Sequence, residues 1–166
     1  MTYTTSNTAN DLVEAFQQLD PDTQLALFWF IYKEMGGAIT PAAPGASTVS
    51  PAIAEGIFNQ IKELPHEEQL NVQRDLICRR NTQLTREYGA VGDTTKLLVW
   101  YLLAQGMENS TIIPMPPGYQ LAEEAQQLLD RVKQMEFEQQ ITFLRDYVAP
   151  MGADGSTAEV DSETGL

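Results

Sequence analysis

The sequence has little of what secretion, membrane insertion or disulfide cross-linking would need. Its 166 residues include one cysteine, Cys78, so no disulfide can form within the chain. The opening stretch MTYTTSNTANDLVEAF lacks the basic and apolar regions of a secretory signal. No run approaches the roughly 18 apolar residues of a membrane-spanning helix. We therefore expect a cytoplasmic protein with no transmembrane segment.

Basic residues are also scarce. The chain has 10 lysines and arginines against 23 aspartates and glutamates, which gives a formal net charge of −13. An excess of negative charge repels phosphate backbones and anionic lipid headgroups and favours solubility. Nucleic acid is therefore not an expected partner.

Motifs for catalysis and metal binding are absent as well. The single histidine, His66, follows a proline in a charged turn, and no second metal-ligand residue clusters with it. There is no glycine-rich phosphate loop, nucleophile elbow or H-E-x-x-H motif. Cys78 precedes two arginines, a setting in which a reactive thiol is conceivable, but a half-buried filler thiol is the interpretation we favour. The sequence predicts neither an enzyme nor a metal site.

What the chain does have is helical periodicity along almost its whole length. The clearest helix start combines Asp20 as an N-cap with Pro21 at the first helical position. Segments 38–51 and 112–120 are rich in proline and are predicted as connections. The segments expected to be helical are 20–37, 53–64, 66–80, a short helix containing Leu84 and Tyr88, 94–108, 121–135 and 136–151. We predict an all-α protein with an N-terminal arm (1–10), one helical domain (11–152) and an acidic disordered tail or linker (153–166).

Two of these helices carry matching aromatic stripes. In each stripe, five residues recur at i, i+3, i+4, i+7 and i+10, with adjacent aromatic rings followed by methionine at the end. The stripes are Leu25, Phe28, Trp29, Tyr32 and Met35 in the first, and Leu97, Trp100, Tyr101, Ala104 and Met107 in the second. Each covers about 15 Å of helix. Such stripes are typical of ordinary protein core. However, the run LALFWFIY is apolar on every face, and such a helix is either wholly buried or shared between a core and a ligand.

Several segments resemble one known family. DTQLALFWFIYKEMG, AAPGA, KLLVWYLL, PMPPGYQL and QQITFLRDYV look like the N-terminal, carotenoid-binding domain of cyanobacterial orange carotenoid proteins. The resemblance runs from about residue 10 to residue 152, and it is closer to the stand-alone helical carotenoid proteins. It implies two interleaved four-helix subdomains with a linear keto-carotenoid in a tunnel between them. The implied pigment is canthaxanthin, echinenone or 3'-hydroxyechinenone.

The resemblance also implies which residues contact the pigment. Both aromatic stripes are expected to face it, and Trp29 and Trp100 are expected to bracket an end ring. The other implied contacts are Gln73, Met115, Tyr119, Ile141, Thr142 and Arg145. Gln73 falls where the family typically has an apolar residue, so the sequence leaves this contact open. Flat rings stack on a polyene and methionine adapts to its edges, which explains why leucine would not serve as well.

The function implied by the resemblance is photoprotection without bond chemistry. The pigment would accept energy from bilin pigments or singlet oxygen and release it as heat. Implied partners are the phycobilisome core at the thylakoid surface or a carotenoid-donating homologue of the family's C-terminal domain, with the chain as a monomer or weak homodimer. Without a regulatory domain, quenching is expected to be constitutive or governed by pigment loading. Ala15 stands where antenna-docking members carry a basic residue, which weakens the case for antenna docking. The alternative is a pigment-free adaptor whose stripes bind a partner helix.

Overall fold

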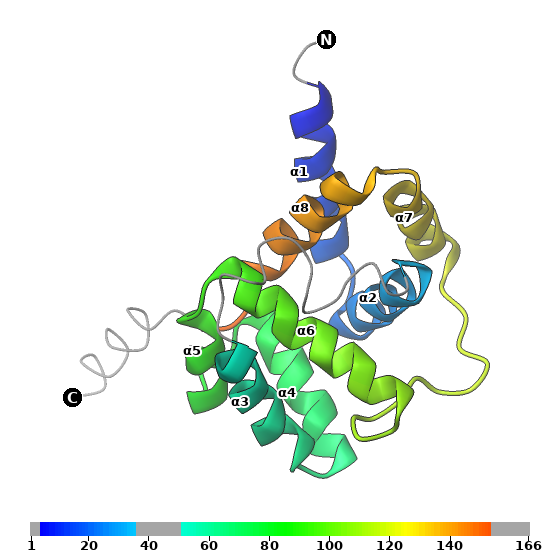
Figure 1. Cartoon of the computed structure of the whole chain (residues 1–166). Coiled ribbons are helices and arrows are strands. Elements are labelled where there is room, and N and C mark those ends of the chain that lie inside the picture. The colour runs from blue at the N-terminus through cyan, green and yellow to red at the C-terminus, as the bar shows by residue number, and fades with distance from the viewer. Residues whose placement is uncertain (1–3, 36–50, 154–166) are drawn as a thin grey trace.

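The protein is all-α in every part that the computed structural model describes, which covers residues 4–35 and 51–153. The all-α prediction is confirmed by eight helices in these ranges. They are α1 (Thr4–Gln17), α2 (Pro21–Met35), α3 (Pro51–Lys62), α4 (His66–Cys78), α5 (Gln83–Gly89), α6 (Asp93–Glu108), α7 (Glu123–Lys133) and α8 (Phe137–Val148) (Figure 1). The predicted connection at 38–51 and the predicted tail lie almost wholly outside the described residues.

Local sequence signals set most of the helix ends. The Asp20 carboxylate accepts a hydrogen bond from the backbone N–H of Thr23 at 3.1 Å, which confirms it as the cap of α2. Pro65 separates α3 from α4, because proline has no N–H to continue a helix. The side chains of Thr82 and Thr85 cap each other's backbone at the start of α5. These ends follow from residues close in sequence, which is why they could be predicted.

Helix α1 was not expected from the sequence. Its residues Leu12 and Phe16 are only 1 % and 0 % exposed, so the helix packs firmly against the core. They are four residues apart and lie on one face of the helix. Because α1 begins at Thr4, the segment predicted as an arm is partly helical.

The helices pack as two sets of neighbours. Helices α3, α4, α5 and α6 contact one another, whereas α1 packs against α7 and α8, and α2 packs against α7. The two sets meet where α6 contacts α8 and where α2 contacts α4 and α6. Figure 1 shows the long α6 crossing the middle of the molecule, with the α6–α7 loop returning along one side. This arrangement brings the two aromatic stripes, on α2 and α6, to the boundary between the sets.

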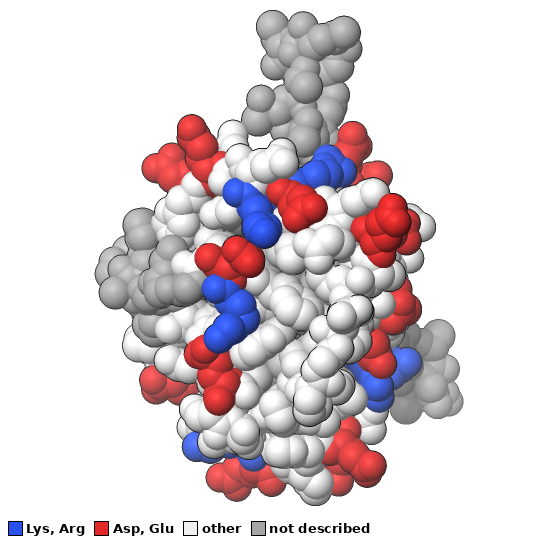
Figure 2. Space-filling view, turned by 90° about the vertical axis from the view of Figure 1, so that its right-hand side faces the viewer, with Lys and Arg blue, Asp and Glu red and all other residues white. Residues whose placement is uncertain are grey.

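Charged side chains lie mostly at the surface. Figure 2 shows acidic groups around the face that carries the α6–α7 loop, several of them beside basic groups, and an uncharged area between them. One exposed pair joins the Lys33 ammonium to the Glu108 carboxylate at 2.9 Å, and exposed pairs of this kind contribute little to stability. No helix among the described residues combines the length and apolar character needed to span a membrane.

The centre of the α1–α8 contact is a cluster of three aromatic rings. Phe16 meets Phe143 edge-on with ring centroids 5.0 Å apart, and the ring of Tyr147 lies 5.3 Å from that of Phe16. The Tyr147 hydroxyl donates a buried hydrogen bond to the side-chain oxygen of Gln24 at 2.6 Å. Burial raises the pKa of Tyr147 above the ordinary value for tyrosine.

The raised pKa of Tyr147 predicts a loss of stability at high pH. The unfolded state ionises near pH 10, whereas the folded state keeps the proton, so the stabilisation is present below about pH 10 and is lost above it. Raising the pH from about 8 to about 11 should lower the free energy of unfolding of both proteins. We expect the drop to be about 1.4 kcal/mol smaller in Tyr147→Phe than in the parent. Urea unfolding at the two pH values measures this. An equal loss in both proteins would contradict it.

Residues 151–153 pack against α4 and α5. The backbone N–H of Gly152 donates to the carbonyl of Leu76 at 2.8 Å, and that of Ala153 donates to the carbonyl of Thr85 at 2.9 Å. Gly152 has φ +81°, and an added Cβ would lie 2.6 Å from Cδ1 of Tyr88. The position therefore requires glycine for both conformation and space.

Replacing Gly152 with alanine should consequently destabilise the fold. We expect Gly152→Ala to lower the free energy of unfolding by about 2 kcal/mol, because a left-handed conformation and a steric overlap act together. Denaturant unfolding monitored by circular dichroism measures the effect. Gly56→Ala is the matched control, since nothing lies within 4 Å of the Cβ it would add. A loss no greater than in this control would show that residues 151–153 do not hold the fold together.

Candidate functional site

The aromatic stripes of α2 and α6 face each other across the boundary between the two helix sets. Phe28 and Trp100 have ring centroids 5.6 Å apart, and Tyr32 and Tyr101 meet edge-on at 5.7 Å. Within α2, Trp29 stacks on Tyr32 at 5.8 Å. The five rings thus meet in two groups, Phe28 with Trp100 and Tyr32 with Trp29 and Tyr101, and we call them together the aromatic row.

Trp100 is held firmly in place by a buried chain of hydrogen bonds. Its Nε1–H donates to the Tyr88 hydroxyl at 2.9 Å, and that hydroxyl donates to the carbonyl of Val148 at 2.9 Å. The Lys96 ammonium lies 5.6 Å from the centre of the Tyr88 ring and donates to the carbonyl of Ala149 at 2.7 Å. Burial holds the pKa of Tyr88 well above its usual value, although the hydrogen bond from Trp100 opposes this. This network joins α5, α6 and α8 behind the indole ring.

The other end of the row is fixed by an acidic residue at the end of α6. The Tyr32 hydroxyl donates to the Glu108 carboxylate at 2.7 Å. Burial raises the pKa of Tyr32, and the neighbouring Glu108 raises it further. The same hydrogen bond, with help from Lys33, lowers the pKa of Glu108. Tyr32 therefore stays protonated and anchored at physiological pH.

Trp29 differs from these rings in having a partly exposed side chain. Its ring lies beneath the Lys33 ammonium at 5.4 Å, and no hydrogen bond of its indole N–H is found within the described residues. Trp29 and Trp100 both line a gap of about 10 Å³ between α2 and α6, which is barely room for one water molecule. The gap is lined by Leu25, Phe28, Trp29, Gln73, Trp100, Leu103, Ala104 and Met107.

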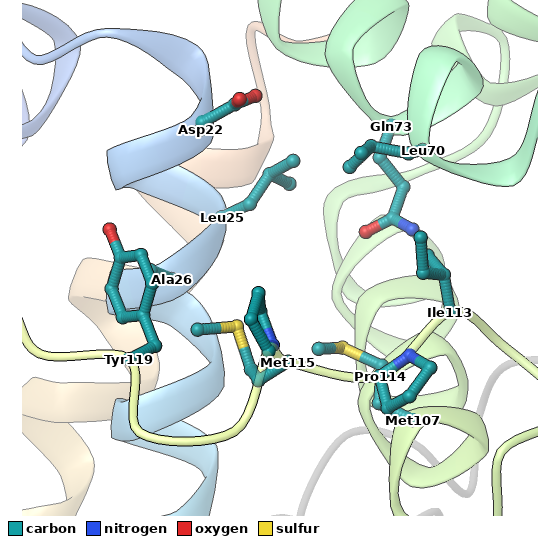
Figure 3. Close-up of a pocket in the computed structure, with 11 residues that line it drawn as sticks. Asp22, Leu25, Ala26, Leu70, Gln73, Met107, Ile113, Pro114, Met115 and Tyr119 are labelled. Carbon is teal, nitrogen blue, oxygen red and sulfur yellow. The ribbon is translucent and has the colours of Figure 1, made fainter. Parts of the chain in front are cut away.

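Beside this gap lies an open hollow of about 170 Å³, walled by α2, α4, α6 and the α6–α7 loop (Figure 3). Its lining is mainly apolar. It includes two methionines, together with two prolines and one tyrosine from the loop. The hollow is lined by Asp22, Leu25, Ala26, Leu70, Gln73, Met107, Ile113, Pro114, Met115, Pro116 and Tyr119. Leu25, Gln73 and Met107 line both spaces, so the hollow and the gap adjoin.

A buried glutamine fixes the loop that forms one wall of the hollow. The side-chain oxygen of Gln69 accepts from the backbone N–H of Ile113 at 2.8 Å, and its nitrogen donates to the carbonyl of Thr111 at 3.0 Å. At the end of α6, Gly106 lies so close to Ile112 that an added Cβ would be 2.5 Å from Cγ1 of that residue. The loop is thus joined to α4 and packed on α6, which holds Met115 and Tyr119 beside the hollow.

The structure brings together most, but not all, of the residues predicted to contact a ligand. Nine of them line the hollow or the gap: Leu25, Phe28, Trp29, Gln73, Trp100, Ala104, Met107, Met115 and Tyr119. Tyr32 and Tyr101 continue the aromatic row, and Met35 and Leu97 pack in or against the core. Ile141, Thr142 and Arg145 lie on α8 and line neither space. The Arg145 guanidinium instead lies 3.5 Å from the Thr94 hydroxyl at the start of α6.

Other lining residues were not predicted from the sequence. They are Asp22, Ala26, Leu70, Leu103, Ile113, Pro114 and Pro116. Leu70 precedes Gln73 by one helical turn, and the loop residues flank Met115, so helical spacing and the apolar character of that turn were signals that could have found them. One prediction about a side chain was wrong: Cys78 is exposed at the end of α4 rather than half-buried.

Comparison with known proteins shows the family. The family model described as the N-terminal part of the orange carotenoid protein matches residues 2–154. The chain belongs to this family. It is 44 % identical over 150 residues to an orange carotenoid-binding domain-containing protein of Nostoc sp., covering 90 % of this chain and 86 % of that protein. It is also 40 % identical over 148 residues to the orange carotenoid-binding protein of Synechocystis sp., covering 87 % of this chain but 46 % of that protein. The chain therefore spans about half the length of this second relative.

Solved structures of relatives share the fold. The Red Carotenoid Protein of Anabaena (Nostoc) sp. binding canthaxanthin superposes with a TM-score of 0.80 at 61 % identity, covering 89 % of this chain and 99 % of that one. The Orange Carotenoid Protein of the same organism, also binding canthaxanthin, gives a TM-score of 0.79 at 42 % identity over 90 % of this chain and 48 % of that one. The family and the helical fold are thus shown by sequence and structure alike.

Proposed function

We propose that this protein binds a keto-carotenoid along the aromatic row and uses it for photoprotection. The observation that carries the proposal is the open apolar hollow that continues into the gap between Trp29 and Trp100. Two relatives of the same fold bind canthaxanthin. The pigment would lie in a tunnel between two four-helix subdomains, which correspond to the two sets of packed helices.

The residues present fit such a ligand in chemistry. Indole and phenol rings offer flat apolar faces to a conjugated chain, and Met107 and Met115 offer flexible thioethers to its methyl groups. The hollow is smaller than the roughly 300–1,000 Å³ of typical ligand sites, so a carotenoid requires the gap to widen. Trp100 is fixed by its hydrogen bond, whereas Trp29 is partly exposed. We therefore propose that the Trp29 side chain moves to widen the gap when the pigment binds.

The chain's contribution would be to hold and shield the pigment. A bound keto-carotenoid supplies low-lying excited states that accept energy and release it as heat. The aromatic row would fix the conformation of the pigment, and the buried residues of α2 and α6 would keep water away from it. Pigment loading would govern quenching of singlet oxygen or of phycobilisome excitation. Ile141, Thr142 and Arg145 lie on α8, and we propose that they contact one end of the pigment.

Colour is the first test of the proposal. Protein produced in cells that make canthaxanthin or echinenone is expected to copurify with the pigment and to show its visible absorption band. The same protein from cells without carotenoids is the control and should be colourless. A colourless product from pigment-producing cells would contradict the proposal and favour a helical adaptor that binds a protein partner.

Quenching is tested with the loaded protein. We expect loaded protein to shorten the lifetime of singlet oxygen, and to lower phycobilisome fluorescence without prior illumination. The pigment-free protein at the same concentration controls for protein effects. Shortened singlet-oxygen lifetime with unchanged phycobilisome fluorescence would restrict the function to singlet-oxygen quenching and contradict the antenna role.

A further inference from the structure

One polar side chain lies in the wall that separates the hollow from the gap. Gln73 on α4 is 4 % exposed and lines both spaces. In Figure 3 its amide points from α4 into the cavity, beside Ile113. The surrounding lining is mainly apolar, so an amide at this place is unexpected for a purely hydrophobic site.

Gln73 contrasts with the glutamine one turn earlier on the same helix. Gln69 is 1 % exposed and uses its oxygen on Ile113 and its nitrogen on Thr111. For Gln73, no hydrogen bond is found within the described residues. Gln69 therefore has a structural role in holding the loop, and Gln73 has none that the described contacts reveal.

The amide of Gln73 points toward the open hollow (Figure 3). Every fully buried side-chain nitrogen or oxygen among the described residues has a hydrogen-bond partner. The Gln73 amide has no partner among these residues, and the hollow is a space that it faces. A ligand that fills the hollow removes water from this amide, and burial without a replacement partner is unfavourable. A ligand oxygen within reach removes that penalty.

The remaining polar groups of the hollow are already paired or lie at its rim. Asp22 forms two hydrogen bonds with the Arg74 guanidinium, at 2.7 and 2.9 Å, and the pKa of Asp22 is lowered by them. Tyr119 is 36 % exposed and lies across the hollow from Gln73 (Figure 3). Gln73 is thus the neutral hydrogen-bond donor placed deepest in the lining.

We infer that Gln73 makes the site selective for a carotenoid whose end ring carries an oxygen. This inference rests on the proposed function. The resemblance implied that the two tryptophans bracket an end ring. The narrow gap between them instead suits the flat polyene and the wider hollow suits an end ring, so the proposal places the ring opposite Gln73. The terminal torsion of glutamine is broad, so its NH₂ can turn toward a ring carbonyl and donate a hydrogen bond. A ring without oxygen would leave the amide buried and unpaired.

Competition between two pigments tests the inference. The protein is produced in cells that contain both β-carotene and canthaxanthin, and the ratio of the two pigments in the purified protein is compared with that in the cells. We expect the parent protein to be enriched in canthaxanthin, and Gln73→Leu to lose about fivefold of that enrichment while still binding pigment. Gln83→Leu, which removes an exposed glutamine amide on α5, is the matched control and should behave like the parent.

The outcomes separate the inference from the proposed function. Equal enrichment in the parent and in Gln73→Leu would overturn the inference while leaving carotenoid binding intact. Absence of pigment from the parent and from both variants would overturn the proposed function, and the inference with it. Gln73→Met places a flexible apolar side chain of similar length at this position. It provides a second test if leucine impairs folding.

The carbonyl of bound canthaxanthin gives a second readout. A hydrogen bond lowers the C=O stretching frequency, which resonance Raman or infrared spectroscopy detects. We expect this frequency to be lower in the parent than in Gln73→Leu and Gln73→Met. The same frequency in all three proteins would show that the amide does not contact the ring oxygen.

Discussion

Replacing Trp29 with alanine is expected to weaken carotenoid binding by roughly thirtyfold. The indole face beside the gap would cover roughly 80 Å² of pigment, which at about 25 cal/mol per Å² corresponds to about 2 kcal/mol. Because Trp29 is only partly buried, its removal should cost the pigment-free fold little. Titration of pigment-free protein with canthaxanthin in detergent micelles, followed by visible absorption, measures the change.

Two other variants make this prediction specific. Phe58→Ala is the control, because Phe58 is also a partly buried aromatic residue but lies on α3 away from both spaces. It should bind pigment like the parent. Trp100→Ala should reduce binding too, but it also removes a buried, hydrogen-bonded ring and should destabilise the pigment-free protein by about 3–5 kcal/mol. Unchanged affinity in Trp29→Ala would show that the pigment does not lie against this ring.

Replacing Tyr88 with phenylalanine is expected to cause a large loss of stability for the removal of one oxygen atom. The Tyr88 hydroxyl is the partner of both the Trp100 indole N–H and the Val148 carbonyl. Without it, the buried indole N–H of Trp100 loses its partner at about 1–3 kcal/mol, and the Val148 carbonyl keeps only its 3.2 Å bond from the Met151 N–H. We expect a total of about 3 kcal/mol and a fall in melting temperature of about 10 °C. Thermal unfolding of the pigment-free protein measures both.

The same variant should also affect the site. Once Trp100 loses its partner, its ring is free to change orientation, so the absorption band of bound pigment should broaden. Tyr119→Phe is the control, since that hydroxyl is on an exposed side chain at the rim of the hollow. A melting temperature for Tyr88→Phe equal to that of Tyr119→Phe would show that the buried chain of hydrogen bonds does not stabilise the fold.

Much of the secondary structure could be predicted because its signals are local. The Asp20 cap, the break at Pro65 and the apolar stripe of α6 act within one or two helical turns, so the residues that decide them are adjacent in sequence. Helix α1 was missed although Leu12 and Phe16 have helical spacing, since two core contacts in a polar stretch are a weak signal by themselves. Its burial depends on α7 and α8, which lie more than a hundred residues away in sequence.

The candidate site could be predicted only in part, and the reason differs from residue to residue. The stripes placed Trp29 on the apolar face of one helix and Trp100 on that of another. Periodicity cannot distinguish a core contact from a ligand contact, however. The packing of α2 against α4 and α6 places both rings beside a gap that continues into a hollow, which periodicity alone does not show. Arg145 stays a predicted pigment contact, and its guanidinium lies 3.5 Å from the Thr94 hydroxyl. The apolar stripe of α8 marks its buried side, but it does not show whether Arg145 meets a ligand or another side chain.

The amino-acid sequence by itself determined that the chain is helical, where most of its helices begin and end, and to which family of proteins it belongs. These properties depend on periodicity, on capping residues and on segments that can be compared directly. Tertiary structure decided which aromatic rings face one another, that Trp100 is fixed while Trp29 is less restrained, and that Gln73 rather than Gln69 faces the hollow. The two glutamines have the same side chain on the same helix, so only contacts with α6 and its loop distinguish them. Burial and hydrogen-bond partners are set by residues distant in sequence, and they exist only once the helices have packed.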